Sequence, residues 1–176
     1  MDQNKEQGKQ ALLVIDVQQG LFERSIPIYK AEEVLANINI LIDKARRSNA
    51  PVIFIQHSSE GSLKYGTDAW QLHPEIQPLA DELIIHKHEG NAFAGTSLDD
   101  ELKKRAVGEL LITGLVTHGC VKATSLGSLD RGYRTLLVSD AHSNFSEDGA
   151  GMIEKWNQAI SAKGAELVRT QDVEFS

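Results

Sequence analysis

The only cysteine of the chain, Cys120, is the residue best suited to act as a nucleophile. It follows the apolar run ELLITGL and the turn VTHG, and we expect it to begin a helix. Backbone N–H groups at the start of a helix stabilise a thiolate, and a nearby lysine lowers the pKa of the thiol further. The same N–H groups could bind the oxyanion of a tetrahedral intermediate. The alternative is a small buried side chain, because free cysteines are often buried.

Two charged residues could assist this thiol. Asp16 comes at the end of an apolar run, where a carboxylate needs a partner, and it could accept the thiol proton. Lys87 lies in an alternating stretch, with its side chain directed opposite to those of His86 and His88, and it could hold both the carboxylate and the thiolate. The alternatives are an acid that caps the following turn and a solvated lysine at the end of a strand.

Short apolar runs alternate with helical patterns along the chain, which indicates repeated strand–helix–strand units. The runs are nearly continuous in apolar residues, as in parallel strands that are covered on both faces. The predicted strands are residues 11–17, 52–57, 82–88, 109–115, 134–140 and 165–170.

Helices are predicted between these strands. In the first, apolar residues recur at spacings of three and four, and Pro51 follows its end. Thr96 or Ser97 can cap the second, which runs through LDDELKKRAV. The segment 58–78 has no sustained period, so we expect a long irregular connection there, of a length that is usually functional. The predicted helices cover about 34–45, 98–107, 118–131 and 147–163.

The predicted architecture is a three-layer α/β fold, in which helices cover both faces of a six-stranded parallel sheet of order 3-2-1-4-5-6. In such sheets, ligands bind beyond the carboxyl ends of the strands, at the point where the strand order reverses. The first and fourth strands flank that point. We therefore expect Asp16 and Cys120 to face the same crevice.

Length and composition limit the possible functions. The 176 residues suit one domain, predicted at 11–176 after a flexible polar tail at 1–10. The net charge of −7 argues against nucleic acid as a partner, and a single cysteine permits neither an internal disulfide nor a four-cysteine zinc site. No stretch reads as a secretory signal or a membrane span, so we expect a cytoplasmic protein.

Three motifs, taken in order, resemble the isochorismatase-like cysteine hydrolases. They are ALLVIDVQQGLF, then Lys87 followed by NAFAGTSL, and ITGLVTHGCVKAT with SLDRGYRTLLVSDA behind it, and the resemblance extends from about residue 11 to about 142. It implies a catalytic triad of Asp16, Lys87 and Cys120. It also implies a cis peptide bond between Val116 and Thr117, and an oxyanion hole formed by the backbone N–H groups of Thr117 and Cys120. Members of this family usually form homodimers or larger homo-oligomers, so we expect one here.

The resemblance also bears on metal binding. The nicotinamidase branch of the family carries a metal on an Asp-x-His motif after the second strand, where this chain has QHSSEGS. His57 alone, without the aspartate, is weak evidence for a site, and we expect neither a metal nor another cofactor. No dinucleotide, nucleotide or serine-hydrolase motif is present in the sequence.

The cysteine also bears on the reaction. Family members that hydrolyse the vinyl ether of isochorismate lack this residue, so Cys120 favours a small-molecule amide, cleaved through a thioester. The segment WQLHP at 70–74 resembles that of metal-free members such as streptothricin hydrolase. The alternatives are a redox-sensing thiol protein and a pocket that binds a small molecule without turnover.

The walls of the crevice are predicted from apolar residues on irregular segments. Phe22, Trp70 and Phe93 are candidates for substrate contact, because small-molecule pockets are largely apolar. Gln18 could bind substrate near Asp16. The alternative for each of these residues is local packing within the loops.

Overall fold

The structure is a computed structural model that describes residues 8–176. Most of the predicted tail, residues 1–7, therefore lies outside the described residues. The first strand, β1 (Lys9–Ile15), begins two residues before the predicted start of that strand at residue 11. None of the helices within residues 8–176 is long and apolar enough to cross a membrane.

A single six-stranded sheet forms the centre of the molecule, with the order β3-β2-β1-β4-β5-β6 and parallel pairing throughout. This confirms the predicted fold class and strand order. After β1, the strands are β2 (Val52–His57), β3 (Leu83–Lys87), β4 (Val107–Leu115), β5 (Arg134–Ser143) and β6 (Glu166–Val168).

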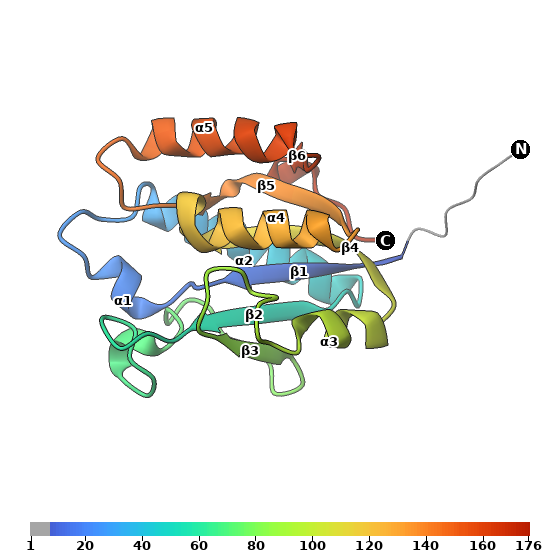
Figure 1. Ribbon diagram of the computed structural model, residues 1–176, viewed down its shortest axis with the longest axis horizontal. Helices are drawn as coiled ribbons and strands as arrows, with labels where there is room; N and C mark the ends of the chain where they lie inside the picture. Colours follow the sequence, from blue (N-terminus) through green and yellow to red (C-terminus); the bar gives the residue numbers. More distant parts are fainter. Residues whose placement is uncertain (1–7) are drawn as a thin grey trace, which may run out of the picture.

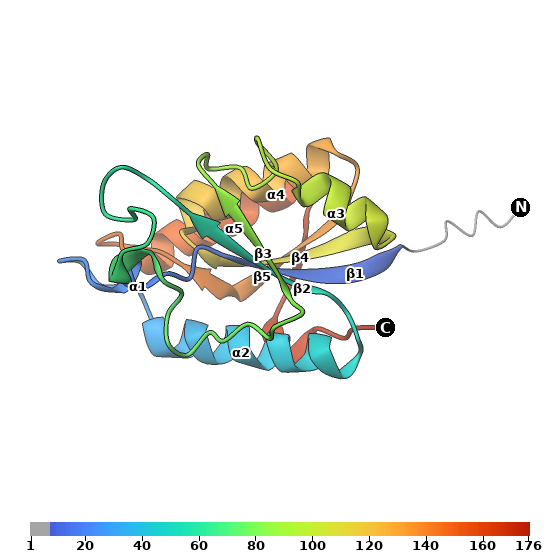
Figure 2. The same ribbon diagram turned by 90° about the horizontal axis from the view of Figure 1, so that it is seen from below.

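Helices cover both faces of this sheet. α2 lies on one face, and α3, α4 and α5 lie on the other (Figure 2). The short helix α1 lies beyond the carboxyl end of β1 (Figure 1). The α-helices are α1 (Gln19–Phe22), α2 (Ala31–Arg47), α3 (Leu98–Lys104), α4 (Lys122–Asp130) and α5 (Gly149–Ala162). Shorter helical turns are η1 (Asp68–Trp70), η2 (Thr117–Val121), which has a π-helical hydrogen bond, and η3 (Thr170–Asp172).

The core has two halves because side chains alternate along each strand. In β1, Leu12 and Val14 face the cluster under α2, whereas Ala11, Leu13 and Ile15 face the cluster under the other helices. All five are completely buried. A strand that is buried on both faces explains why its sequence is continuously apolar.

Two of the predicted helices differ from those in the structure. The helix after Ser97 ends at Lys104, because Ala106 has a left-handed backbone and Val107 already belongs to β4. The helix predicted from His118 begins instead with η2, in which Gly119 has non-helical backbone angles, and regular α-helix starts only at Lys122. The irregular segment 58–78 was predicted correctly apart from η1.

Gly114 of β4 lies directly beside Ile15 of β1. Its φ of +118° is in a region that side chains disfavour, and a Cβ placed there would lie 2.1 Å from the carbonyl oxygen of Ile15. The register between β4 and β5 also shifts between Ile112 and Gly114. The glycine therefore allows β4 to stay paired with β1 just before the turn that carries Cys120.

We predict that Gly114→Ala destabilises the fold by at least about 3 kcal/mol, because both the backbone angle and the neighbouring carbonyl oppose a Cβ. The matched control is Gly61→Ala, where an added Cβ meets nothing within 4 Å. That change is expected to alter stability by less than about 0.5 kcal/mol. Urea unfolding of both variants measures the difference, and similar stabilities would contradict this account of Gly114.

Candidate active site

The buried ammonium group of Lys87 lies at the centre of the site. Its side chain is completely buried, and its Nζ lies 3.1 Å from Asp16 Oδ2 and 3.2 Å from Cys120 Sγ. Two more acceptors complete its surroundings, the carbonyl oxygen of Glu89 and Nδ1 of His57, each at 2.9 Å. The structure thus brings together the three residues predicted to do chemistry and adds His57 to them.

Strand register explains how Lys87 reaches this position. In the parallel pairing of β2 with β3, Lys87 lies beside His57, so both side chains project from the same face of the sheet. The neighbours of Lys87 point the other way, because His86 and His88 are exposed while Lys87 is buried. The alternation predicted for this strand is confirmed.

Asp16 leaves the strand pattern to reach Lys87. Its φ of +51° is left-handed, and its N–H still donates to the carbonyl of Ile55, at 2.9 Å. Burial raises the pKa of the Asp16 carboxyl, and the nearby Lys87 charge opposes that rise. Oδ2 pairs with Lys87, whereas Oδ1 has no hydrogen-bond partner within residues 8–176. Oδ1 is therefore the oxygen available to take a proton.

Cys120 is half-buried in η2, beyond the end of β4. Burial, together with the charge of Asp16, raises the pKa of its thiol to about 12, and Lys87 only partly offsets this. This direction is opposite to the one expected from the turn and the lysine. Removal of the sulfur from water outweighs the field of the ammonium group.

The turn between β4 and Cys120 contains a cis peptide bond, but not where it was predicted. The cis bond joins Leu115 and Val116, one residue before the predicted Val116–Thr117 bond, because the turn begins directly where β4 ends. The Val116 carbonyl then accepts hydrogen bonds from the N–H groups of Gly119 and Val121. The N–H groups of Thr117 and Cys120 stay the predicted oxyanion donors.

A buried polar chain fixes Thr117. Its hydroxyl lies 2.8 Å from Nδ1 of His142, whose Nε2 lies 2.7 Å from Oδ1 of Asn157. The amide oxygen of Asn157 can only accept, so Nε2 carries the proton and the Thr117 hydroxyl donates to Nδ1. Burial lowers the pKa of His142 to about 4, which keeps its ring neutral. Asn144 donates in turn to the Thr117 hydroxyl, at 3.3 Å.

Gln18 binds the protein's own backbone and has no exposed surface. Its Nε2 donates to the carbonyls of His57 and Trp70, at 2.9 and 2.8 Å, and its Oε1 accepts from the N–H of His57 at 2.9 Å. Since the carboxamide is used internally, the predicted substrate contact of Gln18 is not supported. Its role in the structure is to tie the end of β2 and the 58–78 segment to the loop after Asp16.

The three aromatic residues predicted to line the crevice differ in their surroundings. Trp70 is 7% exposed, and its indole N–H donates to Ser58. Phe93 is 4% exposed and stacks on Tyr133. These contacts match the packing alternative for both rings. Phe22 is half-buried and lies against the ring of His73, so it stays a predicted contact.

Asp16, His57 and Cys120 hold potential metal ligand atoms within 4.8 Å of one another. This cluster does not suit a metal ion, because the Lys87 ammonium group contacts a donor atom of each residue, at 2.9 to 3.2 Å. A cation among these atoms would be repelled by the ammonium group. These donor atoms therefore suit the ammonium group of Lys87. His86 is not part of this cluster and packs against Trp70.

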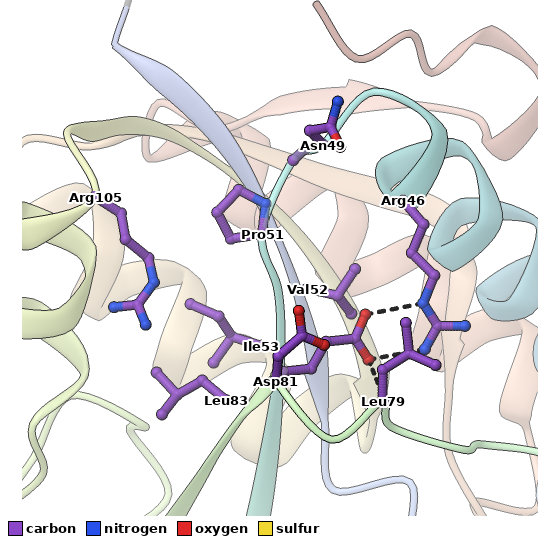
Figure 3. A pocket seen from close by; sticks show the side chains of 11 residues that line it. Arg46, Asn49, Pro51, Val52, Ile53, Leu79, Asp81, Leu83 and Arg105 are labelled. Atoms are coloured by element: carbon purple, nitrogen blue, oxygen red, sulfur yellow. Dashed lines mark hydrogen bonds and ion pairs between the residues drawn. The ribbon is translucent and has the colours of Figure 1, made fainter.

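A pocket of about 380 Å³ lies at the other end of the sheet, where β2 and β3 begin (Figure 3). Val52, Leu83 and Arg105 are among its lining residues. Arg46 and Glu82 form a bidentate ion pair there, with both hydrogen bonds at 2.8 Å. Since the pocket contains no nucleophile and none of the predicted site residues, we do not assign it to the chemistry.

One family model and several known proteins are similar to this chain. The family model described as "Isochorismatase domain" matches residues 10–172. A streptothricin hydrolase from Streptomyces noursei is 34% identical over 169 residues, which cover 94% of this chain and 67% of that protein.

Two solved structures are also similar. An isochorismatase from Pseudomonas putida KT2440 has a TM-score of 0.84 at 29% identity, covering 93% of this chain and 89% of the other. The N-carbamoylsarcosine amidase from Thermoplasma acidophilum has a TM-score of 0.83 at 25% identity, covering 94% of this chain and 97% of the other.

We predict that His142 makes stability fall in mild acid. Its pKa is 6.5 when unfolded and about 4 when folded, so the unfolded chain binds a proton first as the pH falls. This stabilising contribution is complete above the unfolded pKa and is lost as the pH falls toward the folded pKa. Between about pH 7 and about pH 4.5, wild type should lose about 2 to 3 kcal/mol more than His142→Gln. Urea unfolding at both pH values measures this, and equal losses would contradict a neutral buried ring.

We also predict that Asp16→Asn speeds alkylation of Cys120 by iodoacetamide by about tenfold at neutral pH, because loss of the carboxylate charge lowers the pKa of the thiol. Mass spectrometry follows the reaction directly, since the chain has one cysteine. The matched control is Asp43→Asn, on the exposed side of α2, which should not change the rate. A slower or unchanged rate in Asp16→Asn would show that Asp16 does not hold the proton on sulfur.

Proposed function

The chain belongs to the isochorismatase family, and we propose that it is a metal-free cysteine hydrolase that cleaves an amide-type carbon–nitrogen bond of a small molecule. The observation that carries this proposal is the contact of one buried ammonium group with both a carboxylate and a thiol. In this proposal Cys120 is the nucleophile, Asp16 is the general base, and Lys87 positions both of them.

The first step is attack by the thiol. Asp16 Oδ1, which has no other hydrogen-bond partner in the described part of the chain, accepts the proton as Sγ of Cys120 bonds to the carbonyl carbon. The raised pKa of Asp16 makes its carboxylate a stronger base for this transfer. The carbonyl oxygen becomes an oxyanion, and the N–H groups of Thr117 and Cys120 are the proposed donors to it.

The second step releases the amine and then the acid. Asp16 returns the proton to the leaving nitrogen as the carbon–nitrogen bond breaks, which leaves a thioester on Cys120. Water then attacks the thioester and gives its proton to Asp16. When the carbon–sulfur bond breaks, the thiolate recovers that proton and the acid departs. Lys87 stays close to sulfur throughout and stabilises the transient thiolate.

The choice of an amide rests on the nucleophile and on two relatives. The similar proteins are named streptothricin hydrolase and N-carbamoylsarcosine amidase, and both names fit hydrolysis of a carbon–nitrogen bond. We assign this chain to the same class of reaction, and within the family to the metal-free members. We also propose a homodimer or a larger homo-oligomer as its assembly.

A redox-sensing role fits the site less well. Peroxides react with thiolates, and the thiol here has its pKa raised to about 12. There is also no second cysteine in the chain to form an internal disulfide. A thiol that ionises only as it attacks suits a hydrolase.

The test is a panel of primary amides, carbamoyl compounds and lactams, scored by ammonia release and by mass change. We predict turnover of at least one compound, and we expect Cys120→Ala to lower the rate by at least about 10³-fold, because no thioester can form. Rapid quenching of wild type followed by intact-protein mass spectrometry should reveal an acyl adduct on Cys120. Near-ultraviolet circular dichroism of the variant controls for folding. An active Cys120→Ala protein would refute the proposed nucleophile.

A further inference from the structure

His57 is the member of the Lys87 cluster to which the steps above give no role. It is the last residue of β2, and its Nδ1 lies 2.9 Å from Lys87 Nζ. The side chain is half-buried, so one part of the ring faces the ammonium group while another part remains accessible. Gln18 holds the backbone of His57 by two hydrogen bonds, each of 2.9 Å. The buried Gln18 side chain therefore fixes the backbone position from which the His57 imidazole extends.

The contact fixes which ring nitrogen carries the proton. A lysine ammonium group can donate hydrogen bonds but cannot accept them. Nδ1 must therefore offer its lone pair to Lys87, and in the neutral ring Nε2 carries the hydrogen. A doubly protonated ring would place an N–H against the ammonium group and break the contact.

The hydrogen-bonding capacity of Lys87 shows what His57 contributes. The ammonium group has three protons, and its three nitrogen or oxygen neighbours can accept all of them: Asp16 Oδ2, the Glu89 carbonyl and His57 Nδ1. The Cys120 sulfur, at 3.2 Å, is a fourth and weaker acceptor. Without His57, the third proton of this fully buried cation would have only that weak sulfur acceptor.

We propose that neutral His57 is a positioning residue for Lys87, which holds the ammonium group between Asp16 and Cys120 and releases it when the imidazole is protonated. This inference rests on the proposed function, because it concerns the same three catalytic groups. It adds His57 to these groups as a fourth member, and it predicts that their activity declines at acidic pH.

The charges around His57 set the direction of the pH effect. Lys87 on β3 and His88 after it disfavour protonation of His57, whereas Asp16 after β1 and a hydrogen bond with the Glu89 backbone favour it. The Cys120 thiol of η2 also lies beside the ring. Burial is the largest influence, and together with Lys87 it lowers the pKa of His57 below 6.5. Activity should therefore be complete above about pH 6.5 and decline as the pH falls through the lowered value.

The first test needs no substrate. Nitrogen-15 NMR of the histidine side chains in wild type should show His57 with its proton on Nε2 and a pKa below that of an exposed histidine. In Lys87→Met, this pKa should rise, because a neighbouring positive charge is lost. A proton on Nδ1 in wild type, or the same His57 titration in both proteins, would overturn the proposal. The wild-type tautomer decides even if Lys87→Met does not fold.

The second test uses any amide that the chain hydrolyses. His57→Leu should lower kcat by about tenfold or more with little change in KM, since Lys87 loses an acceptor. His57→Asn places an amide oxygen near the position of Nδ1, so it should retain kcat within about threefold and change the acid limb of the pH profile, to which Asp16 alone of the two groups then contributes. An unchanged acid limb in His57→Asn would overturn the proposal. If no amide is hydrolysed, the proposed function fails while the NMR result still decides the role of His57.

Discussion

The burial of one ammonium group is the constraint on which the site depends. A lysine without any exposed surface is stable only if oxygen and nitrogen acceptors replace the water it has lost. Lys87 finds these acceptors on three segments: the loop after β1, the end of β2 and the loop after β3. The Cys120 sulfur approaches from a fourth segment, the turn after β4. The groups at the carboxyl ends of these strands are therefore arranged around the positive charge of Lys87. Removal of any one of them leaves that charge less well compensated.

Much of the fold could be predicted from the sequence, because a parallel sheet covered on both faces imposes a simple pattern. Each inner strand is continuously apolar, and the residue that ends the run lies at the carboxyl edge. Combined with the strand order that is common in such sheets, this reasoning brought Asp16 and Cys120 to one crevice. Alternation along β3 also gave the inward direction of Lys87. These inferences depend on the spacing of apolar residues within each segment and on the order of the segments along the chain. Both can be read directly from the sequence.

The features that could not be predicted depend on contacts between distant segments. The left-handed backbone of Asp16 and the position of the cis bond after Leu115 are set by how strand ends meet. The pKa of Cys120 follows from the depth of burial, which the position of a residue at a helix start does not reveal. His57 could have been recognised as part of the site, because β2 and β3 were both predicted and their ends lie side by side.

The hydrogen bonds that Gln18 makes with the backbone affect which parts of this fold can vary in sequence. Gln18 binds main-chain atoms of His57 and Trp70, and main-chain atoms are present whatever side chains those positions carry. Between these two anchors, the outward side chains of residues 59–68 are free to vary while the anchored backbone keeps its place. Exposed side chains of this segment can therefore change without displacing the backbone that carries His57.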